Sequence, residues 1–169
     1  MKWIGYLLIA MGLCLTIAQV IVYGGQLPDK VASHFNAAGA ADGWMSRTGF
    51  LVFLVAFQFG LCGCLLLIGW GLSRLPVSMI NIPHRDYWLD DIRRESTLRI
   101  NRDMLALISG LTALFLVAIF QMTIQANLQI EEAALNGWFW GITGAYMVGV
   151  LSCAGWLVWR FARIPPDAG

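Results

Sequence analysis

The chain has 169 residues, a formal net charge of +1 and a hydrophobic fraction of 59%, and its mean hydropathy is +0.69. So little polar surface cannot cover a water-soluble domain, and a net charge near zero gives no electrostatic attraction for nucleic acid. These values exclude a soluble globular domain and a nucleic-acid partner.

Four stretches contain no Asp, Glu, Lys, Arg or His, and they cover residues 3–28, 48–73, 104–130 and 133–159. Each is longer than the roughly 20 apolar residues that cross a bilayer as a helix. Their apolar residues run continuously instead of alternating with polar ones, as transmembrane strands would require. The sequence therefore predicts an all-α polytopic membrane protein, with one four-helix transmembrane domain over residues 1–169.

The predicted elements follow in chain order. We expect membrane spans at 3–23, 50–72, 103–125 and 137–161, joined by an outer loop 24–49, an inner loop 73–102 and an outer turn 126–136. Two prolines prevent a regular helix in the inner loop as far as His84. From Asp90 onward, opposite charges stand one helical turn apart, as in Asp90 and Arg94. Helix three should therefore begin near Asp90 and extend into the cytoplasm.

The distribution of basic residues predicts the orientation in the membrane. With the N-terminus inside, nine lysines and arginines lie on the inner segments, and only Lys30 and Arg47 lie outside. Such an excess is typical of cytoplasmic segments. We expect both termini and the inner loop to be cytoplasmic.

The sequence offers no cofactor site. All four cysteines lie inside the apolar stretches, where they suit packing. The two histidines, His34 and His84, fall on opposite sides of the predicted membrane and cannot share a metal ion or a haem. We predict no cofactor and no metal.

The spans also lack the ionisable groups that pumps and ion-coupled carriers need at membrane depth. Their polar residues include Gln58, Thr112 and Gln121. Two interpretations remain open for these side chains. They form hydrogen bonds between helices, or they line a groove for a lipid, quinone or peptide.

Small residues recur at every fourth position of helix four and form a ridge: Gly137, Gly141, Ala145, Gly149 and Cys153. A ridge of this kind lets another helix approach closely. The partner helix belongs either to the same bundle or to a second protein.

Two loops hold the candidate site residues. In the outer loop, polar, aromatic and turn-forming residues gather within a short segment: His34, Asn36, Gly39, Asp42, Trp44 and Arg47. They could bind a metal ion or polar ligand, or hold the loop together through hydrogen bonds to its turns. The tryptophan could anchor the loop at the membrane interface or stack on a ligand.

In the inner loop, the candidates for contact with lipid phosphates or a cytoplasmic partner are His84, Tyr87, Trp88, Arg93 and Arg94. The aromatic pair is expected at the headgroup boundary, with the arginines toward anionic lipid.

These loops carry a family resemblance. The outer segment LPDKVASHFNAAGAADGWMSR resembles the "LP … P.HFN..G..D.W.SK" signature of the membrane family known as domain of unknown function 1648, which also occurs in SdpI-type bacterial immunity proteins. The inner segment INIPHRDYWLDDIRRES resembles the "NLPNKDYWL..ERR.ET" segment of that family. Val31 and Ala32 stand where the family usually shows an Ile-Pro step, and His84 stands where Asn is more usual. The resemblance implies a bacterial inner-membrane protein and, for the SdpI-type relatives, immunity to a secreted toxin.

No catalytic group can be assembled, because every cysteine lies in a span and neither histidine has a supported partner. We therefore expect a non-catalytic integral membrane protein that acts as an accessory subunit or as an immunity or sensor-like binding module. Its expected partners are membrane lipids and either another membrane protein or a second copy of the chain. The alternative is a transporter or enzyme that handles a lipid or hydrophobic small molecule.

Overall fold

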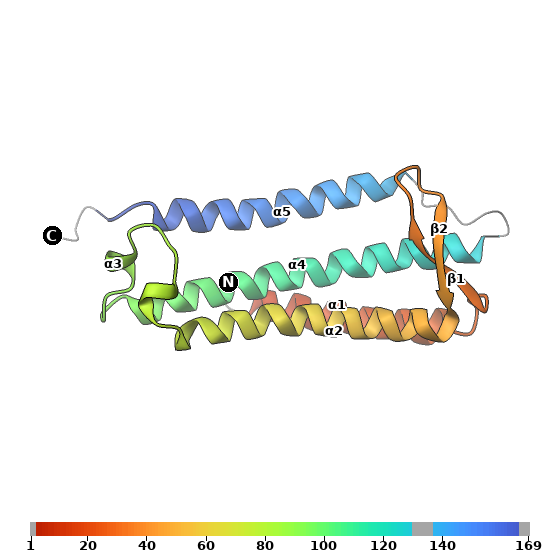
Figure 1. Ribbon diagram of the computed structural model, residues 1–169, viewed down its shortest axis with the longest axis horizontal. Helices are drawn as coiled ribbons and strands as arrows, with labels where there is room; N and C mark the ends of the chain where they lie inside the picture. Colours follow the sequence, from red (N-terminus) through yellow and green to blue (C-terminus); the bar gives the residue numbers. More distant parts are fainter. Residues whose placement is uncertain (1–2, 130–136, 166–169) are drawn as a thin grey trace.

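The computed structural model describes residues 3–129 and 137–165. Four long helices lie side by side: α1 (Ile4–Tyr23), α2 (Arg47–Gly71), α4 (Arg94–Leu128) and α5 (Trp138–Phe161) (Figure 1). All four are long and apolar enough to cross a membrane. The predicted spans are thereby confirmed as helices, while most of the predicted turn 126–136 lies outside the described residues.

The tightest packing joins α1 to α4. A Cβ atom added at Gly5 would lie 2.5 Å from the backbone carbonyl carbon of Ala106, and one added at Gly12 would lie 2.6 Å from Cβ of Ala113. On α4, a Cβ atom added at Gly110 would lie 2.8 Å from the carbonyl oxygen of Gly5 in α1. The two backbones therefore touch at positions where only glycine fits, as small residues permit in membranes.

Hydrogen bonds from polar side chains connect α1 and α2 to α4. Gln19 of α1 donates to the carbonyl oxygen of Val117 at 2.9 Å and to Oε1 of Gln121 at 3.0 Å. Gln58 of α2 is fully buried and donates to the carbonyl oxygen of Ala113 at 3.2 Å. These contacts support hydrogen bonding between helices for Gln58 and Gln121.

The outer loop folds into a β-hairpin, which the all-α prediction did not include. Strands β1 (Lys30–Phe35) and β2 (Ala41–Ser46) pair antiparallel, with irregular register around His34. The hairpin stands across the end of the bundle (Figure 1). Val31 of β1 and Leu27, which precedes it, pack against α2 and α4. The buried core formed there consists of Leu27, Val31, Phe50, Leu54, Leu116, Phe120 and Ile124.

The arginine-rich end of the bundle contains two short 3₁₀ turns, Leu72–Arg74 and Val77–Met79, and the four-residue helix α3 (Arg85–Trp88). Helix α4 begins at Arg94, later than the expected start near Asp90. Asp90 accepts a hydrogen bond from the backbone N–H of Arg93 at 2.8 Å and pairs with its guanidinium. Arg94 instead donates to the carbonyl oxygen of Leu75 at 3.1 Å, so the predicted Asp90–Arg94 pair is replaced by Asp90–Arg93.

Helix α5 lies along α4, on the side away from α1 and α2 (Figure 1). None of its most apolar segment is buried within the described residues, against 44% for α4. Added Cβ atoms at Gly137 and Gly141 would meet no described atom within 4 Å, and one at Gly149 would reach only the side chain of Leu111, at 3.6 Å. Within the described residues, the ridge does not pack inside the bundle at Gly137 and Gly141, and α1 supplies the glycines that α4 packs against closely.

Replacing Gly12 by alanine should lower the free energy of unfolding by about 1–3 kcal/mol, because the added Cβ forces α1 away from α4. Gly60→Ala on α2 is the matched control, since its added Cβ would meet nothing within 4 Å in the described part of the chain. Unfolding of the detergent-solubilised protein by heat or by SDS measures both. Equal stability of the two variants would contradict the close α1–α4 approach.

Candidate functional site

The hairpin turn is built by the polar residues that the sequence singled out. His34 Nδ1 lies 2.5 Å from Asp42 Oδ1, across the two strands. Asn36 Oδ1 accepts from the backbone N–H groups of Ala38 at 2.9 Å and Ala40 at 3.1 Å, and Gly39 adopts φ 82°. An Asx turn followed by a left-handed glycine is a common way to reverse a chain. These contacts support the interpretation of a loop-folding network.

The base of the hairpin is closed by a second pair. Arg47 forms an ion pair with Asp29, and its backbone N–H donates to the carbonyl oxygen of Asp29 at 2.9 Å. Trp44 is half exposed, and the ammonium of Lys30 lies 5.3 Å from its ring centroid. The structure thus brings the outer candidates together in one hairpin.

The residue that holds this hairpin on the bundle is one the sequence did not indicate. The amide of Asn127, near the end of α4, accepts from the N–H of Ala32 at 2.7 Å and donates to its carbonyl oxygen at 2.8 Å. Both backbone groups of a strand residue are therefore satisfied by one side chain, as a neighbouring strand would satisfy them. A proline at position 32 could not donate this bond. The available signal was a polar amide at the end of an otherwise apolar span.

At the arginine-rich end, Trp88 holds the inner loop on the bundle, as Asn127 holds the hairpin. Its ring is 4% exposed, its Nε1–H donates to the carbonyl oxygen of Phe161 at 2.9 Å, and the two rings meet edge to face. Thr97 donates to the carbonyl oxygen of Trp88 at 2.8 Å. The ring of Trp88 therefore docks the inner loop onto the C-terminal end of α5, and the expected place of Trp88 at the headgroup boundary stays a prediction.

The other inner-loop candidates are also used largely within the loop. Arg93 donates from Nε to the carbonyl oxygen of Tyr87 at 3.0 Å, and its guanidinium lies 4.0 Å from the centroid of that ring. His84 is exposed and adopts a left-handed conformation with φ 49° at the start of α3. Arg94 donates to the loop backbone as well, so both arginines help to hold the loop together, and their contact with lipid phosphates stays a prediction.

A groove of about 450 Å³ lies between the hairpin turn and the start of α5. It is lined by the turn residues Phe35, Asn36, Ala37, Ala38 and Gly39 and by Gly137, Phe139 and Trp140. Residues from the predicted outer site and from the predicted ridge therefore meet here. A volume of this size is in the range of small-ligand and peptide sites.

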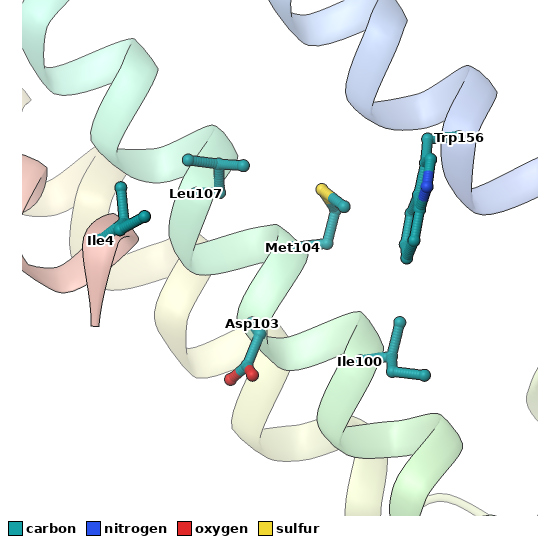
Figure 2. A pocket seen from close by; sticks show the side chains of 6 residues that line it. All are labelled: Ile4, Ile100, Asp103, Met104, Leu107 and Trp156. Carbon is teal, nitrogen blue, oxygen red and sulfur yellow. The ribbon is translucent and has the colours of Figure 1, made fainter. Parts of the chain in front are cut away.

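A smaller apolar cavity of about 190 Å³ lies at the opposite end, between α1, α4 and α5. Figure 2 shows Met104 and Leu107 of α4 with Trp156 of α5 around it, and the carboxylate of Asp103 turned away from Trp156. A cavity of this size holds a benzene-sized molecule and is too small for a lipid. Within residues 3–129 and 137–165, no group of three His, Cys, Asp or Glu side chains is placed to hold a metal ion.

Replacing Asn127 by leucine should release the hairpin from α4, because it removes both bonds to Ala32. Leaving these buried backbone groups without partners should cost about 1–3 kcal/mol. Hydrogen exchange should accelerate at the amide of Ala32. Asn101→Leu is the control, since Asn101 donates only to the carbonyl oxygen of Thr97 within its own helix. Unchanged protection at Ala32 in Asn127→Leu would contradict the docking.

Comparison with known proteins relates one segment in the first half of the chain to a family. No curated protein and no solved structure matches the chain. A family model described as Domain of unknown function (DUF1648) matches residues 11–59. This segment contains most of α1, the hairpin and the first half of α2, whereas Trp88, Asn127 and α5 lie beyond it. The chain therefore has four helices that could span a membrane, and its segment from α1 through the hairpin to the middle of α2 is similar to the DUF1648 domain.

Proposed function

We propose that this chain is a non-catalytic integral membrane protein that assembles with another membrane protein through α5, as an accessory subunit or as an immunity or sensor-like module. The observation that carries the proposal is the lack of burial along α5. The helix contributes an exposed small-residue face while the other three helices form the core. Membrane helices associate through faces of this kind, because small residues allow backbones to approach.

The contacts that attach α5 to the rest of the chain do not cover the small-residue face proposed for assembly. Tyr146 stacks on Phe115 with ring centroids 4.2 Å apart, and its hydroxyl lies 3.1 Å from Oγ1 of Thr112. At its C-terminal end, Phe161 holds Trp88. These attachments fix the helix in place and leave Gly141 and Gly144 exposed.

The groove at the hairpin turn favours the immunity or sensor-like form of the proposal. It places an aromatic wall from α5 beside a turn with polar backbone groups, which suits an extended peptide. A ligand bound there would contact the hairpin and α5 at once. Binding could in this way be passed to a partner that packs on α5.

A double variant, Gly141→Leu with Gly144→Leu, tests the assembly. Native mass spectrometry of the gently extracted wild-type protein should show a second copy or a co-purifying membrane protein, and the double variant should lose it. Thermal unfolding should stay unchanged, since added Cβ atoms at these positions would contact none of the described residues within 4 Å. Gly60→Leu with Gly63→Leu on α2 is the matched control. A wild-type protein that is strictly monomeric and carries no partner would overturn the proposal.

The proposed location is a bacterial inner membrane, with both termini in the cytoplasm. Support comes from the excess of Lys and Arg at the α3 end of the bundle. A C-terminal green fluorescent protein fusion should therefore fluoresce, and a C-terminal alkaline phosphatase fusion should be inactive. The reverse pattern would contradict this orientation and leave the α5 assembly to be judged by its own test.

A further inference from the structure

A second groove lies at the arginine-rich end, where α1 begins, α2 ends and α4 passes between them. It has a volume of about 490 Å³. We call it the arginine–aromatic groove, and its lining residues are Trp3, Tyr6, Leu66, Trp70, Arg99, Arg102 and Asp103. None of its basic residues belongs to the inner-loop set that the sequence indicated.

The side chains of the groove are arranged by depth. Trp3 stands just before α1, and Trp70 stands one residue before the end of α2. Tyr6 and Leu66 lie about one turn deeper into these spans. Rings at helix ends suit the headgroup level, and the deeper side chains suit the start of the acyl chains.

Packing holds Arg102 against α2. The stem of Arg102 passes Gly69, whose added Cβ would stand 3.6 Å from both Cα and Cγ of Arg102. A long basic side chain packed by its stem keeps its charged end at the membrane surface. Arg99 lies three residues earlier on α4 and lines the same groove.

The charges of the groove suit a phosphodiester. Two guanidinium groups and the carboxylate of Asp103 leave one net positive charge, which complements a lipid headgroup with one net negative charge. Figure 2 shows this carboxylate turned away from Trp156, and it lines the groove beside Arg99 and Arg102. It can accept hydrogen bonds from headgroup hydroxyls.

Of the other basic residues at this end, Arg160 and Arg163 stack on rings outside the groove, whereas Arg74 stacks on a ring of the groove itself. Arg160 lies over the ring of Trp88, at 4.4 Å, and Arg163 lies over the ring of Trp159, at 4.7 Å. Arg74 lies over Trp70, with its guanidinium carbon 3.2 Å from the ring centroid, and thereby adds positive charge at the edge of the groove. The surroundings strengthen the attraction for an anion.

We propose that the arginine–aromatic groove binds the headgroup of an anionic glycerophospholipid of the phosphatidylglycerol type. Arg99 and Arg102 hold the phosphodiester, Asp103 accepts from the headgroup hydroxyls, and Tyr6 and Leu66 contact the first carbons of the acyl chains. This site is separate from the assembly face of α5.

The test is competition between two lipids with identical acyl chains, phosphatidylglycerol and phosphatidylcholine, followed by native mass spectrometry. One arginine at a membrane surface raises the affinity for an anionic lipid about fivefold, so two arginines raise it about 25-fold. The wild-type protein should prefer phosphatidylglycerol by this factor. Arg99→Gln with Arg102→Gln should bring the preference close to parity while thermal unfolding without lipid stays unchanged.

The matched control is Arg85→Gln with Arg163→Gln, which removes the same charge from the same end and should keep the preference. Equal loss in both double variants would show diffuse attraction and overturn the site, as would equal binding of the two lipids by the wild-type protein. Millimolar inorganic phosphate should leave the lipid bound. Displacement by phosphate alone would overturn the assignment to a lipid.

Discussion

The close approach of α1 to α4 is the constraint on which the rest of the structure depends. In a bilayer, helices gain nothing from burying apolar surface against each other, so close backbone contact and hydrogen bonds must hold them together. Gly5 and Gly12 on one helix and Gly110 on the other remove the side chains that would keep the backbones apart. With the two backbones in contact, Gln19 can reach the carbonyl oxygen of Val117. The core of α1, α2 and α4 then has a fixed geometry, and both the hairpin and the inner loop are hydrogen-bonded to α4.

Both attachments use the same physical device, a side chain that satisfies backbone groups of a distant segment. Asn127 does this for β1 at one end, and Thr97 with Trp88 does it at the other. Val31 of the hairpin and Ile80 and Leu89 of the inner loop also pack in apolar clusters, but such contacts have no direction, whereas an unpaired buried amide is costly. Bonds of this kind therefore fix the position of each loop. They also explain why Trp88, Arg93 and Arg94 fold the inner loop, whereas Arg99 and Arg102, further along the rigid α4, border a groove.

The sequence predicted the spans well because charge exclusion acts on each segment alone. Helix α1 (Ile4–Tyr23) differs by one residue from the predicted span 3–23. The sequence did not predict the hairpin, since β2 contains Asp42 and Gly43, which disfavour strands. In addition, β1 is held by Asn127, whose bond to Ala32 spans 95 residues of the chain. Gly43 faces His34, where an added Cβ would lie 2.9 Å from that of His34, and this reason for a glycine is visible only in the pairing. Small-residue spacing likewise identified a face on α5 but could not say which helix meets it.

The contrast between α1 and α5 bears on function. Both helices carry glycines, yet those of α1 are filled by α4, and those at the start of α5 have nothing described against them. A glycine in a helix interior lowers stability by about 0.5–1 kcal/mol relative to alanine. On α1 the close contact offsets that cost within the chain. On α5 no described residue makes such a contact at Gly141 or Gly144, and this is the face that we propose for assembly. A partner helix seated on this face would supply that contact, and the groove beside Asn36 and Trp140 would then lie at the edge of the assembled interface.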